Sequence, residues 1–141
     1  MAKGWDFDPS QFMGIVEEDV GKRLRIISMA LLSEIVYASP VGNVTLWKKG
    51  TAPKGYTGGG FRANNQVSIG SPDYSDLPDT DKTGAATIQK GNAVIAQAKP
   101  FAVIYIQNNK PYAEELERGH STQAPTGVYA NSFHGVSQAY K

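Results

Sequence analysis

Residues 9–38 carry an apolar pattern that commits a large part of the chain to one long helix. The apolar side chains recur every three or four residues: Phe12, Val16, Val20, Leu24, Ile27, Leu31 and Ile35. This spacing puts them on one side of an α-helix and predicts a single buried stripe. Asp8 suits the N-cap, Pro9 suits the first helical position, and Pro40 ends the helix after Ser39.

The length of this helix leaves two interpretations open. At 1.5 Å per residue, 30 residues span about 45 Å, which is long for a chain of 141 residues. The helix is either the core of the domain, or it projects and packs on a neighbouring subunit.

Two segments predict strands. Apolar and polar residues alternate over residues 61–69, which indicates a strand with one wet face, as in an antiparallel sheet. Residues 101–107 are apolar and rich in β-branched and aromatic side chains, which favours a central strand. Long loops are expected over residues 40–60 and 70–84, where Gly, Pro and Asp gather.

Three further helices are expected, over residues 85–98, 112–118 and 128–140. The residues "KGN" at 90–92 also permit a hairpin in place of the first. The prediction is therefore an α+β fold in a single domain covering residues 1–141. Its long N-terminal helix packs on a small, mainly antiparallel sheet, with further short helices and long loops.

Composition excludes several classes of function. The formal net charge of +1 gives no general attraction to nucleic acid or an anionic membrane. The absence of cysteine excludes disulfides, thiol chemistry and thiolate metal sites. No apolar run approaches the roughly 20 residues needed to cross a bilayer, and the N-terminus lacks the apolar region of a secretory signal. We expect a protein made in the cytoplasm, without a membrane partner.

The motifs that suggest chemistry lack the partners that the chemistry needs. The residues "DTDKTG" at 79–84 match the first half of a calcium loop, but Lys90 stands where that loop needs a bidentate Glu. An acidic turn that caps the next helix explains them better. The residues "GYTGGG" at 55–60 lack the Gly-Lys-Ser/Thr ending of a phosphate loop. We expect no cofactor and no metal ion.

Residues 108–127 hold a His, a Ser and three Glu, which raises the possibility of a hydrolase. His120 and Ser121 are adjacent, however, and no Gly-x-Ser-x-Gly elbow is present. The expectation is that the chain is not an enzyme. Two alternatives stay open: a small hydrolase-like enzyme that uses His120, and a nucleic-acid-binding module that uses Lys48, Lys49 and Lys54.

The same segment is rich in residues that shape turns. Asn108 and Asn109 suit a turn at a strand end because Asn tolerates left-handed backbone. Gly119 is expected to end a short helix with a positive φ. The residues expected to set turns are Gly42, Pro111, Gly119, Pro125 and Gly127.

Three ordered motifs resemble the neck and tail-completion proteins of tailed bacteriophages. They are "SPVG" at 39–42, "GGGFRANNQVSIG" at 58–70 and "YIQNNKPYAEELERGHSTQAPTG" at 105–127. The chain departs from the family pattern at Asn65, where Trp is common, and in a longer loop over residues 42–58. The resemblance implies a structural protein of the virion, assembled as a ring, commonly a hexamer, at the head–tail junction.

The resemblance also implies partners. They are portal, adaptor or stopper proteins on the head side and tail-tube or tail-terminator proteins on the tail side, with DNA passing through the ring without sequence-specific binding. Interfaces favour aromatic and Arg anchors. The residues expected at an interface are Trp47, Tyr56, Phe61, Arg62, Tyr112 and Glu117.

Overall fold

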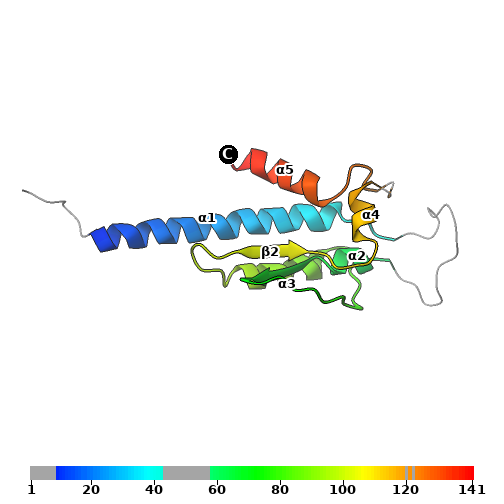
Figure 1. Cartoon of the computed structure of the whole chain (residues 1–141), viewed down its shortest axis with the longest axis horizontal. Helices are drawn as coiled ribbons and strands as arrows, with labels where there is room; N and C mark the ends of the chain where they lie inside the picture. Colours follow the sequence, from blue (N-terminus) through cyan, green and yellow to red (C-terminus); the bar gives the residue numbers. More distant parts are fainter. Residues whose placement is uncertain (1–8, 43–57, 120, 122) are drawn as a thin grey trace, which may run out of the picture.

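One long helix runs the length of the molecule and every other element is arranged around its C-terminal half. The computed structural model describes residues 9–42, 58–119, 121 and 123–141. Helix α1 (Pro9–Ala38) is followed by α2 (Gly60–Ala63), β1 (Gln66–Ile69), α3 (Ala85–Ile95), β2 (Ile104–Gln107), α4 (Ala113–Glu117) and α5 (Tyr129–Ala139). Figure 1 shows α5 on one side of α1, with the sheet and α3 on the other.

The α+β fold predicted from the sequence is confirmed. Helix α1 has the bounds that the apolar stripe indicated. Helices α3, α4 and α5 lie within the segments 85–98, 112–118 and 128–140. The hairpin considered at residues 90–92 is wrong, because these residues continue α3.

The sheet is smaller than the sequence suggested. Strands β1 and β2 form a two-stranded antiparallel sheet in which Gln66 pairs with Gln107 and Ile69 with Ile104. The expectation of a central strand over residues 101–107 is wrong within the described chain, since β2 pairs only with β1. Its first residues are not extended: Phe101 has a φ of 63°, a left-handed conformation that a strand cannot include.

The predicted strand over residues 61–69 is also wrong in its first half. Gly59, with a φ of 99°, turns the chain into the single helical turn of α2. Tertiary packing explains the difference. Phe61 is 5% exposed and packs with Ile35, Ala124 and Val128, a burial that outweighs the alternating pattern.

Two apolar clusters flank α1. Ile35 faces the first, with Phe61, Ala124 and Val128. Leu32 and Val36 face the second, with Ile95 of α3. Leu32, Ile35 and Val36 are at most 1% exposed, so the C-terminal half of α1 is the core of the domain.

The N-terminal part of α1 projects beyond the rest of the molecule (Figure 1). Gly21 is the first buried residue among the described side chains of this helix. A Cβ on Gly21 would lie 3.2 Å from Pro100 Cγ, and Arg25 Nη1 donates a hydrogen bond of 3.0 Å to the carbonyl of Ala98. One half of the long helix is thus core and the other half projects, while its packing on a neighbouring subunit stays a prediction.

A polar loop over residues 71–80 lies against the ends of the sheet. Gln66 Nε2 donates to the carbonyl of Ser75 at 2.6 Å, and the amide of Asp73 donates to Gln107 Oε1 at 3.0 Å. Asn109 Nδ2 donates to the carbonyls of Asp73 and Ser75. These side-chain amides therefore satisfy backbone groups of the loop and hold it against the sheet. In the described part of the chain, no helix is long and apolar enough to cross a membrane.

We expect Gly91→Ala to destabilise the protein by about 1–3 kcal/mol through overpacking. A Cβ at Gly91 would collide with Leu32 and lie 2.9 Å from Val67 Cγ2. Gly135→Ala in α5 is the matched control, because nothing lies within 4 Å of its Cβ position. Both changes gain the same helix propensity, so chemical denaturation of the two variants isolates the contact. Equal stabilities would contradict the close packing of α3 on α1.

Candidate interaction surface

Two of the residues expected at an interface are used inside the chain. Phe61 belongs to the core, so it is not available as a surface anchor. Arg62 binds the end of α1: Nη2 donates to the carbonyls of Ser39 at 2.8 Å and Tyr37 at 3.3 Å. Its Nη1 also donates to the carbonyl of Lys82. A guanidinium on the free carbonyls at a helix C-terminus is a capping interaction.

Glu117 is likewise used inside the chain, at the start of α5. Its carboxylate accepts hydrogen bonds from the backbone amides of Val128 (3.0 Å), Tyr129 (2.8 Å) and Ala130 (2.9 Å). These amides have no partner within the helix, and the positive end of the helix dipole favours the anion. Burial raises the pKa of Glu117, but the three donated hydrogen bonds lower it, and the net pKa lies below the ordinary value of 4.5.

Tyr112 is the expected interface residue that the structure places at the surface. It is 41% exposed, and its ring centroid lies 6.1 Å from that of Phe61. Trp47 and Tyr56 lie outside the described residues. So do His120, on which the hydrolase alternative rests, and the lysines at 48, 49 and 54, on which the nucleic-acid-binding alternative rests.

Two of the glycines predicted to set turns have a positive φ. Gly119 has the expected positive φ, 86°, and Gly127 has a φ of 94°. A Cβ on Gly119 would collide with the carbonyl of Pro125. The turn therefore brings the end of α4 against the segment that leads into α5. Pro111 is exposed just before α4, and Gly42 lies against Gly58.

The acidic turn before α3 is a cap, as the sequence indicated. Asp81 Oδ1 accepts from the amide of Gly84 at 2.9 Å, and Oδ2 accepts from the amide of Thr87 at 2.8 Å and from its hydroxyl at 2.7 Å. Burial raises the pKa of Asp81, and these hydrogen bonds bring it below the ordinary value.

A buried polar cluster that the sequence did not predict joins four segments. Asn65 Nδ2 donates to Ser39 Oγ at 2.8 Å, and Asn65 Oδ1 accepts from Tyr129 Oη at 2.7 Å and from Asn108 Nδ2 at 3.2 Å. Burial and the nearby charge of Glu117 both raise the pKa of Tyr129, so its hydroxyl keeps its proton. The paired asparagines at 64–65 and 108–109 are the sequence feature that could have indicated this cluster.

This cluster brings together the three motifs that carry the family resemblance. Ser39, Asn65 and Asn108 belong to one motif each. The first and third motifs also meet where Gln123 bonds both backbone groups of Val41, at 3.0 and 2.8 Å. The motifs thus build the scaffold at the end of the molecule where α2 and α4 lie (Figure 1).

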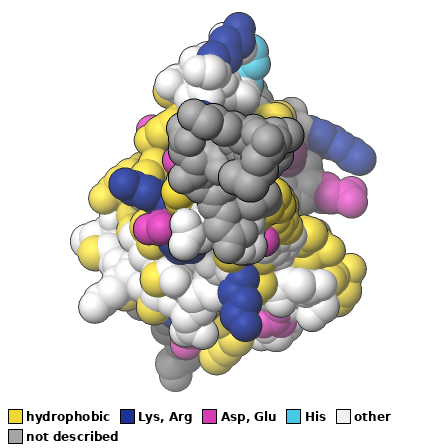
Figure 2. Space-filling model, turned by 90° about the vertical axis from the view of Figure 1, so that its left-hand side faces the viewer, with side chains coloured by type: hydrophobic (Ala, Val, Ile, Leu, Met, Phe, Trp, Pro, Cys, Tyr) yellow, Lys and Arg dark blue, Asp and Glu magenta, His cyan; other side chains and the backbone are white. Residues whose placement is uncertain are grey.

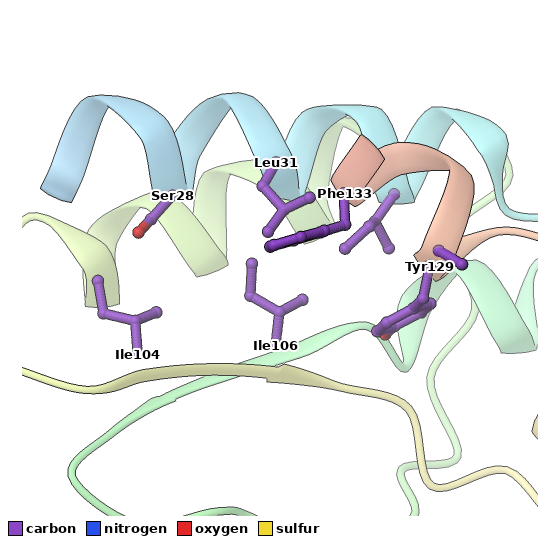
Figure 3. A pocket seen from close by; sticks show the side chains of 8 residues that line it. Ser28, Leu31, Ile104, Ile106, Tyr129 and Phe133 are labelled. Atoms are coloured by element: carbon purple, nitrogen blue, oxygen red, sulfur yellow. The ribbon is translucent and has the colours of Figure 1, made fainter. Parts of the chain in front are cut away.

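An apolar groove lies between α1, β2 and α5. Its volume is about 420 Å³, and its lining residues are Ser28, Leu31, Ile35, Ile104, Ile106, Tyr129, Ala130 and Phe133. Figure 3 shows Ile104 and Ile106 pointing from β2 toward α1, with Phe133 reaching in from α5. Phe133 is 64% exposed, so one wall of the groove is an aromatic ring open to solvent.

Apolar side chains are exposed on more than one side of the projecting part of α1. Met13 is 52% exposed and Ile15 66% exposed. Figure 2 views the molecule from this end, where hydrophobic side chains lie among basic and acidic ones. Phe101 and Val103, in the turn before β2, are also more than half exposed. Large apolar side chains at the surface of a small domain favour contact with a partner, so these residues and the groove are candidates for an interaction surface.

We expect Glu117→Gln to lower the free energy of unfolding at pH 7 by about 1–3 kcal/mol, because a neutral amide binds the α5 amides less strongly. Since the pKa of Glu117 is lowered in the folded chain, its contribution is fully present above about pH 4.5 and is lost as the pH falls through the folded value. Urea denaturation from pH 7 to pH 3 should show the two proteins converging in stability. The exposed neighbour Glu115→Gln is the control, and it should track the wild type throughout.

We expect Gly119→Ala to destabilise more than Gly70→Ala. Both glycines have a positive φ, 86° and 84°, so both changes carry a left-handed penalty of about 1–2 kcal/mol. At Gly70 nothing lies within 4 Å of the Cβ position, whereas at Gly119 the Cβ meets the Pro125 backbone. The extra loss of stability in Gly119→Ala measures that contact. Gly119→Val should lose more stability than Gly119→Ala. Thermal melts that rank Gly70→Ala as the more damaging would contradict the turn geometry.

Comparisons with known proteins add no relative: no family model matches the chain, and neither a curated protein nor a solved structure matches it.

Proposed function

We propose that the chain is a structural protein of a tailed-phage virion. In this proposal it forms a homo-oligomeric ring at the head–tail junction, completes the neck or the tail end, and joins the capsid portal to the tail. The motifs at 39–42, 58–70 and 105–127 support the proposal because they resemble those of neck and tail-completion proteins. Their convergence on one hydrogen-bonded cluster supports reading them as a single pattern.

The observation that carries the proposal is the apolar surface that the subunit leaves open. The projecting part of α1 and the groove beside α5 expose Met13, Ile15 and Phe133. A ring subunit needs one such patch facing each of its two neighbours, because a head-to-tail contact uses two different patches of the same chain. Contacts with portal, adaptor or stopper proteins on one side and tail proteins on the other would use further surface, including Tyr112.

We expect this chain to be present in several copies per particle at one axial position, commonly six. Quantitative mass spectrometry of purified virions gives the copy number, and electron microscopy of particles that carry a labelled chain gives the position. His120→Ala and Ser121→Ala should leave the yield of infectious particles largely unchanged, since the ring needs no catalytic group. Virions that lack the chain, or hold one copy, would refute the proposal. Loss of infectivity in a folded His120→Ala variant would favour the hydrolase alternative.

A further inference from the structure

The apolar stripe of α1 continues beyond the core onto the projecting part of the helix. It is buried at Ile35 and half-buried at Leu31. The stripe then continues toward the N-terminus through residues that are half-buried or exposed: Ile27, Leu24, Val20, Val16 and Met13. These residues follow one another at intervals of three or four, so they form one seam along the helix.

One acidic and one basic residue flank this seam, and their positions favour a second copy of the same helix as the partner. Asp19 follows Val16 by three residues, and Arg23 follows Val20 by three residues. Because both are offset from the seam by the same interval, they lie on the same flank of it. Both side chains are exposed, and neither makes an ion pair with another described residue.

We propose that the projecting part of α1 pairs with the same helix of a second copy of this chain, antiparallel and two-fold about Val20. In this register Val16 meets Leu24 of the second copy, Met13 meets Ile27, and Val20 meets its own counterpart. The two apolar seams cover each other, as in an antiparallel helix pair.

Charge complementarity sets the direction. In the antiparallel register, Asp19 of each copy lies within about 3 Å, along the helix axis, of Arg23 of the other, which gives two identical ion pairs. A parallel two-fold pair would put Asp19 of one copy and Arg23 of the other on opposite flanks of the seam, so neither ion pair would form. An anionic membrane is a poor occupant, because the acidic residues Glu17 and Asp19 lie on the two flanks of the seam.

This contact adds a second interface to the proposed virion protein. Only its place in a virion rests on the proposed function. A two-fold contact joins two copies and does not close a ring. Ile15, which lies outside the seam, and the groove beside α5 remain as two different patches for neighbours within a ring, while the α1 pair links copies across the two-fold axis.

The test is a charge exchange in the full-length chain, followed by sedimentation equilibrium and native mass spectrometry. The wild type is expected at twice the chain mass of 15.2 kDa, or at a multiple of it. Asp19→Arg alone leaves two Arg facing two Arg, and Arg23→Asp alone leaves two Asp facing two Asp. For each variant alone, the dissociation constant of the pair should rise about tenfold or more. An equimolar mixture of the two variants restores both ion pairs, so it should form a heterodimer near wild-type strength.

The matched control is Glu18→Arg. Glu18 is two residues from both Val16 and Val20, so it lies on the opposite side of the helix from the seam. It carries the same change of charge as Asp19→Arg and should pair like the wild type. Circular dichroism confirms that each variant is folded.

Four outcomes would overturn the pairing: a monomeric wild type, an oligomer whose size Asp19→Arg does not change, a mixture that fails to recover, or an equal loss in Glu18→Arg. The proposed ring is tested separately. If the chain is present in virions but does not pair in solution, the helix pairing is refuted and the proposed function is not. If the chain pairs in solution but is absent from virions, the proposed function is refuted and the pairing is not.

Discussion

The fold depends on the burial of two adjoining faces of α1 along the same turns of the helix. Leu32 and Val36 pack against Ile95 of α3, while Ile35 packs against Phe61 and the segment that leads into α5. A two-stranded sheet is marginal by itself in water. Here α1 and α3 cover the apolar face of β1 and β2, and the side-chain amides of Gln66, Gln107 and Asn109 bind the backbone of the 71–80 loop to the end of the sheet. Without α1, neither apolar cluster would have its central residues.

Polar capping then connects the smaller elements to this core. Arg62 binds the end of α1, Asp81 the start of α3 and Glu117 the start of α5. Each is a charged side chain on backbone groups that a helix end leaves without partners. Short helices of 4, 5 and 11 residues would be marginal alone. Their position comes from these caps and from the asparagine cluster around Asn65.

The sequence predicted what depends on local spacing. The stripe from Val16 to Ile35 located α1 to the residue, and the order of Pro, Gly and acidic residues located the cap at Asp81 and the positive φ at Gly119. What depends on distant contacts was missed. Phe61 was assigned to a strand because alternation cannot show that Ile35 buries it in a helical turn, and Phe101 was assigned to β2 because its left-handed backbone has no local signal. The sequence also does not show that the charges of Arg62 and Glu117, two residues expected at an interface, bind helix ends within the same chain.

The contact between Gly42 and Gly58 has a consequence for the length of the chain between them. The backbone of Gly58 lies against the carbonyl of Gly42 and 3.0 Å separates its Cβ position from Val41 Cγ1, so the two ends of this connection meet at one point of the surface. When both ends are fixed together, doubling the length of a flexible connection costs only about 0.6 kcal/mol in closure entropy. Insertions and deletions between residues 42 and 58 can therefore accumulate without moving α1 or α2. A peptide tag or a reporter domain placed between these two glycines should therefore leave the rest of the scaffold unchanged.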